Sequence, residues 1–182
     1  MTGLAYRVAP RSKKALRRIA EEWWGGLGVT GDRFPIVQLV DPVLSKHFGD
    51  RYTFAVLEHK QMGDSHGLTD PDQLIMLIRE DVYDGANSGV GRDRFTLAHE
   101  FAHLLLHGGR YLQRLDPKIQ AVGSHQKYED SEWQANAFAS ELLMPVAVVR
   151  RFSSAAELAL AAGVSMQAAE VRLKALRAEG IL

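Results

Sequence analysis

The chain has 182 residues, a length that fits one ordinary domain or a domain with a small appendage. Its 22 lysine and arginine residues balance 22 aspartate and glutamate residues, so its net charge gives no general affinity for nucleic acid. There is no cysteine, which excludes disulfides and thiolate metal ligands. The N-terminus lacks the pattern of a secretory signal, and no apolar run approaches the ~20 residues that span a membrane. We therefore expect a soluble, cytoplasmic protein with no membrane association.

The first half of the chain predicts one long helix and a small sheet. Residues 11–27 place an apolar stripe opposite a basic face and end at glycines, which indicates an amphipathic helix. Residues 51–58 and 74–79 are typical of strands. The stretch 61–67 between these strands predicts a turn, and the glycine-rich stretch 84–91 predicts a loop. The strands should form a small sheet that packs on the helix that follows.

That next helix, residues 94–107, is the most informative stretch of the chain, and it reads Arg-Phe-Thr-Leu-Ala-His-Glu-Phe-Ala-His-Leu-Leu-Leu-His. His99 and His103 are four residues apart, so they share one face of a helix. Two imidazoles in this register can occupy adjacent corners of a zinc tetrahedron. The pattern His-Glu-x-x-His on a helix is the signature of zinc peptidases.

The helix is apolar almost all round and should therefore be buried. Buried histidines and a buried glutamate are costly unless they have partners, and a metal would supply one. Glu100, next to the first histidine, is placed to take a proton from a water that the metal activates. We interpret His107, one turn beyond His103, as a cap of the helix end in preference to a contact with substrate.

A catalytic zinc site needs a third protein ligand and leaves its fourth position open for water. The sequence offers Glu132, on a predicted helix over residues 131–145. Asn136 follows one turn later and is suited to hydrogen-bond a metal ligand. Glu129 and Asp130 are rival ligands, because one turn of uncertainty in the helix could exchange either of them for Glu132. The alternative is an ordinary amphipathic helix with a surface glutamate.

The C-terminal segment is typical of two helices that are broken at Gly163, with Ser165 as the N-cap of the second helix. This arrangement resembles a helix-turn-helix. A DNA contact would use its polar side chains, namely Gln167, Arg172, Lys174 and Arg177. Because Glu170 and Glu179 dilute the positive charge, we favour packing against the rest of the domain over direct DNA binding.

Two separated motifs of the chain resemble those of the ImmA/IrrE family of metallopeptidases. The first is Arg94-Phe-Thr-Leu-Ala-His-Glu-Phe-Ala-His, and the second is Glu132-x-x-Ala-Asn-x-Phe-Ala-x-x-Leu-Leu-Met-Pro. The resemblance extends from about residue 67 to the C-terminus. Two departures from the family pattern occur. Ala102 stands where the family often has glycine, and Gln134 stands where many members have a second glutamate, which favours Glu132 as the ligand.

The resemblance implies that His99, His103 and Glu132 bind Zn²⁺ and that Glu100 is the catalytic base. It also implies an α+β fold, a mostly helical, zincin-like metallopeptidase of the gluzincin type with a small β-sheet. We expect residues 1–150 to form this metallopeptidase domain and residues 151–182 to form a helix-turn-helix-like segment packed on it.

The same resemblance implies a narrow biological role. Members of the family typically cleave a helix-turn-helix repressor or an antitoxin encoded nearby, in stress responses, mobile elements or toxin–antitoxin systems. We therefore predict a zinc-dependent endopeptidase with one regulatory protein as its substrate. The competing hypothesis is a non-catalytic toxin–antitoxin or transcriptional partner that keeps the zincin fold for docking. The intact Glu100 favours catalysis, because a docking module has no chemical need for it.

Overall fold

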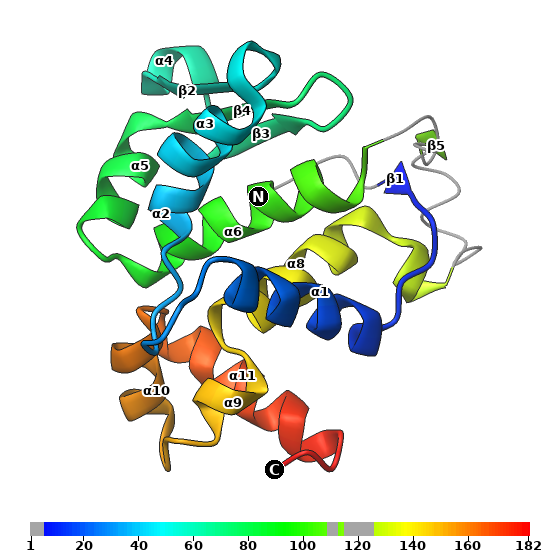
Figure 1. Cartoon of the computed structure of the whole chain (residues 1–182), viewed down its shortest axis with the longest axis vertical. Coiled ribbons are helices and arrows are strands. Elements are labelled where there is room, and N and C mark those ends of the chain that lie inside the picture. The colour runs from blue at the N-terminus through cyan, green and yellow to red at the C-terminus, as the bar shows by residue number, and fades with distance from the viewer. Residues whose placement is uncertain (1–5, 109–112, 115–125) are drawn as a thin grey trace.

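The computed structural model describes residues 6–108, 113–114 and 126–182 (Figure 1). Helix α6 (Gly91–Leu106) crosses the middle of the molecule, with the sheet and helices α2 to α5 on one side and helices α8 and α1 on the other. The helices that surround it are α1 (Lys13–Gly26), α2 (Ile36–Gln38), α3 (Leu44–Phe48), α4 (His59–Met62), α5 (Glu80–Asn87), α8 (Ser131–Leu143), α9 (Val146–Val149), α10 (Ala155–Ala162) and α11 (Met166–Ala178). A π-helical turn, η1 (Leu39–Val43), joins α2 to α3, and 3-10 turns η2 (Gly49–Arg51) and η3 (Lys127–Glu129) precede β2 and α8. The predicted α+β fold, mostly helical with a small sheet, is confirmed.

The main sheet has three strands in the order β2-β4-β3. Strand β2 (Thr53–Leu57) runs parallel to β4 (Ile75–Arg79), and β3 (Gly67–Asp70) runs antiparallel to β4. Strand β3 lies at an edge of this sheet and packs against α6. A second pairing joins β1 (Tyr6–Arg7) to β5 (Gln113–Arg114).

The predicted turn over 61–67 is present, at residues 63–64 between the end of helix α4 at Met62 and the start of strand β3 at Gly67. A second sequence prediction in this half of the molecule is wrong in part. The glycine-rich stretch expected to be a loop over 84–91 is helical up to Asn87, because α5 continues through Gly85. A side chain at Gly85 would come within 2.0 Å of the Asp93 carboxylate. Glycine is needed there for the close approach of α5 to the start of α6, and not for a flexible loop.

Helix α6 is buried on nearly every face, as its composition predicts. Its small and apolar residues Leu97, Ala98, Phe101 and Ala102 are at most 1% exposed. Glycine at position 91 allows the first turn of α6 to touch the backbone of the α10–α11 turn, since a Cβ atom there would lie 2.2 Å from the carbonyl carbon of Val164. The first turn of α6 is therefore packed tightly against the C-terminal segment.

The C-terminal segment contains the two predicted helices. Gly163 adopts a left-handed conformation (φ +65°) after α10, and the Ser165 hydroxyl accepts a hydrogen bond from the Ala168 amide at the start of α11. Arg172, which was one possible DNA contact, is only 4% exposed and forms an ion pair with Glu141 of α8. Its guanidinium therefore faces the domain core. Among the described residues, no helix has the length and apolarity that crossing a membrane requires.

Candidate metal centre

The two predicted histidine ligands lie on the face of α6 that packs against α8. The Nε2 atoms of His99 and His103 are 3.0 Å apart. The side chain of His99 is 3% exposed and that of His103 is 17% exposed. One imidazole is thus buried, and the other is partly exposed at the edge of the site.

Glu132 completes a cluster of three side chains that are suited to bind a metal ion. Its carboxylate oxygens lie 3.3 Å from His99 Nε2 and 3.2 Å from His103 Nε2. The position of Glu132 follows from the start of α8, where the Asp130 carboxylate accepts a hydrogen bond from the Trp133 amide as the N-cap. Glu132 therefore falls in the first turn of α8, facing α6.

The rival ligands have other partners. Asp130 caps α8, as described above. The Glu129 carboxylate accepts hydrogen bonds from the Arg7 guanidinium at 3.1 Å and from the Gln126 amide at 3.1 Å. Of the three acidic residues weighed from the sequence, the structure brings only Glu132 to the two imidazoles.

The separations in this cluster fit a tetrahedral metal centre. Ligand atoms about 2.0–2.1 Å from a zinc ion stand roughly 3.3–3.4 Å apart at the corners of a tetrahedron. The three observed separations, 3.0, 3.2 and 3.3 Å, are close to this value. Two imidazole nitrogens and one carboxylate are also a donor set that catalytic zinc sites use. The residues that are present therefore fit the metal.

Electrostatics in the site favour a bound cation. Burial acts to raise the pKa of Glu132, but hydrogen bonds with His103 and His99 outweigh it and hold the pKa of this carboxyl well below its usual range. Burial, helped by the neighbouring His103, lowers the pKa of His107 to about 3. The carboxylate is thus ionised and the adjacent His107 is neutral at physiological pH. This combination leaves a negatively charged carboxylate beside two imidazole nitrogens.

Two further polar residues contact the ligand imidazoles, and a third lies behind one of them. Asn136, predicted to hydrogen-bond a ligand, places its Oδ1 atom 3.2 Å from His99 Nδ1. The ring of His107 lies 2.9 Å from that of His103, nitrogen to nitrogen, and Gln134 lies beyond it. His107 is the C-cap residue of α6, as interpreted from the sequence, but its ring is 4% exposed and points into this chain of contacts. The sequence alone contains no signal for that orientation, because it depends on how α6 and α8 pack.

Glu100, the predicted base, is 6% exposed and faces strand β3, outside the three-residue cluster. Its Oε2 atom accepts a hydrogen bond of 2.7 Å from the Thr69 hydroxyl. A Cβ atom on Gly67 would lie 2.6 Å from Glu100 Cγ, so only glycine leaves room for this carboxylate. Both β3 residues were missed by the sequence interpretation, because a four-residue strand with one large apolar side chain gives almost no periodic signal.

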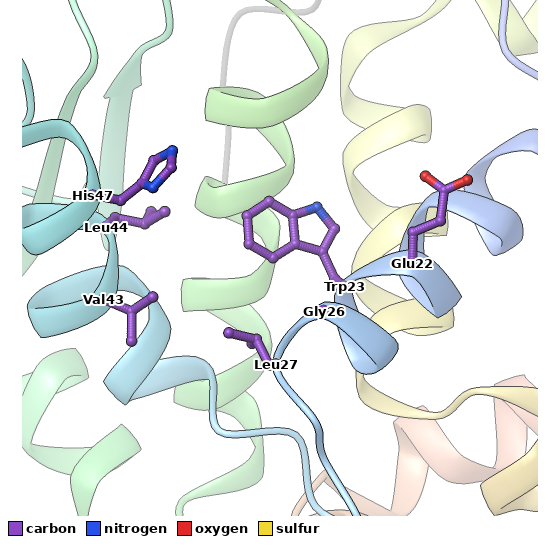
Figure 2. A pocket seen from close by; sticks show the side chains of 7 residues that line it. All are labelled: Glu22, Trp23, Gly26, Leu27, Val43, Leu44 and His47. Atoms are coloured by element: carbon purple, nitrogen blue, oxygen red, sulfur yellow. The ribbon is translucent and has the colours of Figure 1, made fainter.

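A cavity of about 330 Å³ lies elsewhere, between the end of α1 and helix α3 (Figure 2). Trp23 of α1 and its C-cap residue Leu27 line one side, and Leu44 and His47 of α3 line the other. Trp23 packs edge-to-face on Phe101, with ring centroids 5.0 Å apart. Phe101 follows His99 by two residues and so lies on the opposite side of α6. This cavity is therefore separate from the metal cluster.

The fold and the cluster together define the class of the protein. A buried helix that carries two histidines, a carboxylate from a second helix and a small sheet beside them are the features of a metallopeptidase-like domain. A model of the Peptidase M78 family, described as an IrrE N-terminal-like domain, matches residues 57–174. The chain belongs to this family, as its motifs indicate.

Comparison with solved structures agrees on the fold. The structure of a Mycobacterium tuberculosis transcriptional regulator is similar, with a TM-score of 0.53 and 15% sequence identity. The similarity covers 87% of this chain and 55% of that chain, so this chain spans about half the length of the regulator. No curated protein matches the sequence.

Proposed function

We propose that the protein is a zinc-dependent endopeptidase, with His99, His103 and Glu132 as metal ligands and Glu100 as the catalytic base. The observation that carries this proposal is that the two carboxylates lie in different places, one within the metal cluster and one beside it. Glu132 meets both imidazoles, whereas Glu100 stands outside that cluster and is held by a single hydroxyl from β3. A protein that used the metal only for its fold would have no chemical need for the second carboxylate.

The chain's own residues supply most of the proposed mechanism. When bound, zinc supplies Lewis acidity, which acidifies water and polarises a carbonyl group. His99 and His103 present nitrogen lone pairs, and Glu132 adds a negative charge that holds the cation. Glu100 takes a proton from the attacking water and passes it to the leaving amine. The Thr69 hydroxyl donates to Glu100 and so fixes the direction in which the carboxylate points.

Strand β3 supports an extended peptide as substrate. The sequence did not indicate which strand lies at the edge of the sheet, and the structure places β3 there, in contact with α6. Two β3 residues, Gly67 and Thr69, touch Glu100. A peptide that added to the free edge of β3 as another strand would run past the proposed base.

The proposed substrate is one regulatory protein, a helix-turn-helix repressor or an antitoxin encoded nearby. The family to which the chain belongs supports this choice. Such a substrate implies a cytoplasmic role in a stress response, a mobile element or a toxin–antitoxin system. Direct DNA binding is not part of the proposal, in keeping with the buried position of Arg172.

The test uses Glu100→Gln as a trap. This variant keeps the three metal ligands and loses the base, so it should retain zinc and hold substrate without cleaving it. Proteins captured by the variant in the native host, with and without DNA damage, would be incubated with the wild type and searched for new termini by mass spectrometry. His103→Ala, which removes a ligand, is the control for metal-dependent cleavage.

We expect one regulator to be captured and then cut by the wild type alone. Cleavage by Glu100→Gln at the wild-type rate would contradict the mechanism. A partner that is captured firmly but never cut, under stress or without it, would replace the peptidase with the docking alternative, a non-catalytic toxin–antitoxin or transcriptional partner.

A further inference from the structure

A series of hydrogen bonds extends from His103 away from the metal cluster into the core. His103 Nδ1 lies 2.9 Å from His107 Nδ1, and His107 Nε2 lies 3.3 Å from Gln134 Oε1. His107 is 4% exposed and Gln134 is fully buried. Each of these two side chains therefore has few hydrogen-bond partners other than the one that the structure gives it.

Gln134 determines which atom donates and which accepts in each of these hydrogen bonds. Its Nε2 atom lies 2.8 Å from the carbonyl oxygen of Ala9 and 2.7 Å from that of Tyr128. Backbone carbonyls can only accept hydrogen bonds, so the amide nitrogen must face them and the amide oxygen must face His107. The orientation of this side-chain amide is thus determined by two backbone groups on other segments of the chain.

From Gln134 the proton positions follow one by one. His107 must donate from Nε2 to the amide oxygen, and a neutral imidazole then has an acceptor at Nδ1. His103 donates to that acceptor from its own Nδ1, which leaves a lone pair on Nε2. That lone pair points toward His99 and Glu132, where the metal ligands converge. If the donor and acceptor roles in these hydrogen bonds were exchanged, His103 would carry its proton on Nε2, and that nitrogen could not bind the metal.

We propose that His107 and Gln134 are positioning residues that hold His103 in the tautomer required for metal binding. The inference rests on the proposed zinc site and adds a role for two residues outside it. His99 is served separately, because its Nδ1 atom faces Asn136 Oδ1 at 3.2 Å. Outer partners of this kind typically change metal affinity by about 10- to 100-fold when they are removed.

The first test compares two substitutions at one position. His107→Phe keeps a buried ring and removes the acceptor, so zinc affinity, measured by competition with a chromophoric chelator, should fall about 10- to 100-fold. In His107→Asn the Oδ1 atom stands where Nδ1 stood and can still accept from His103, so most of the affinity should return. His59→Phe, at an exposed histidine outside the site, should bind zinc as the wild type does.

A second readout separates positioning from a loss of packing. In the zinc-loaded wild type, nitrogen-15 NMR of the histidine rings should show His103 protonated at Nδ1, with a slowly exchanging proton, and His107 protonated at Nε2. In His107→Phe the His103 Nδ1 proton should exchange rapidly, and in His107→Asn it should be protected again. A merely structural role for His107 would not make this proton depend on the acceptor at position 107.

Failure of this inference can be told apart from failure of the proposed function. Unchanged zinc affinity in His107→Phe, or a His107 ring that is protonated at Nδ1 in the loaded wild type, would overturn the positioning role alone. A wild type that binds no zinc would overturn the metal site and the positioning role together. Loss of affinity in His107→Phe, with recovery in His107→Asn, supports the role whether or not a substrate of the peptidase has been found.

Discussion

Helix α8 carries a half-buried glutamate, Glu132, and a buried one, Glu141, with opposite surroundings. Glu141, near its end, is 2% exposed and accepts paired hydrogen bonds from Arg172 and from Arg17. Glu132, in its first turn, meets two imidazoles, and no lysine or arginine is recorded as its ion partner within the described part of the chain. Two guanidiniums thus surround the first carboxylate, whereas the ion partners of the second are imidazoles alone.

This difference shows how a structural ion pair can be told from a ligand site. Burial acts to raise the pKa of Glu141, but hydrogen bonds from Arg172 and Arg17 outweigh it and lower the pKa. The charge of Glu141 is thus compensated within the chain. Glu132 has only imidazole partners in the chain, so a bound cation would supply the full opposite charge that its carboxylate lacks. One helix thereby serves stability at one end and metal binding at the other.

The largest expected effect concerns Glu132, in the first turn of α8. Replacing Glu132 with Gln removes the one negative ligand, so zinc binding should weaken roughly a thousandfold, about one third of the 10–16 kcal/mol typical of protein zinc sites. The metal-free protein should lose less stability in urea than Glu141→Gln does, because the partners of Glu132 are imidazoles and not buried guanidiniums. Chelator competition and urea unfolding measure the two quantities. A clear loss of metal-free stability would place Glu132 with the structural ion pairs.

Substitution of Glu141, near the end of α8, should instead lower stability and leave zinc affinity unchanged. Glu141→Gln leaves the buried Arg172 guanidinium without its negative partner, whereas Arg17 keeps its ion pair with Glu179, and the free energy of unfolding should fall by about 3 kcal/mol. The low end of the usual range is expected because the Gln carbonyl can still accept one hydrogen bond. Zinc affinity of the folded protein should not change. Equal effects of the two substitutions on both quantities would contradict the comparison.

A third substitution tests whether cleavage depends on the position of the Glu100 carboxylate. Gly67→Ala brings a methyl group onto the Glu100 side chain and should displace its carboxylate. A displacement of about 1 Å should lower the cleavage rate about 100-fold, with zinc content unchanged. Gly26→Ala is the matched control, since no atom lies within 4 Å of the added methyl group. Full activity in Gly67→Ala would exclude Glu100 as the base.

The smallest effect is a pH dependence of stability. Because the folded-state pKa of Glu141 is lowered, its contribution to stability is complete above the unfolded pKa of about 4.3 and is lost as pH falls through the folded value. Below pH 4.3, the metal-free wild type should therefore lose stability more steeply with acid than Glu141→Gln does. Urea midpoints measured across the acid range would show this difference. Parallel curves would mean that the arginines do not favour the ionised form.

The sequence allowed much of the metal side to be predicted. The spacing of His99 and His103 is a property of one helix, and helix geometry alone brings their rings together. The third ligand was harder, because Glu129, Asp130 and Glu132 differ only in where α8 begins. The N-cap of α8 at Asp130 settles that question in three dimensions.

The remaining contacts depend on packing between distant segments and could not be predicted. Thr69 and Gly67 touch Glu100 from a short edge strand, which the sequence interpretation did not predict. Arg172 pairs with Glu141 across 31 residues, and Gln134 reaches the carbonyl of Ala9 across 125 residues. Periodicity within one element contains no information about such partners.

The most direct test of the account is zinc-edge X-ray absorption on the zinc-loaded wild-type protein. The account predicts a four-coordinate ion with two imidazole nitrogens and with oxygen ligands, all at about 2.0–2.1 Å. The outer-shell scattering of two imidazole rings should be visible in the spectrum. A spectrum with only oxygen ligands, or with one imidazole, would contradict the assignment of His99 and His103 and with it the proposed peptidase.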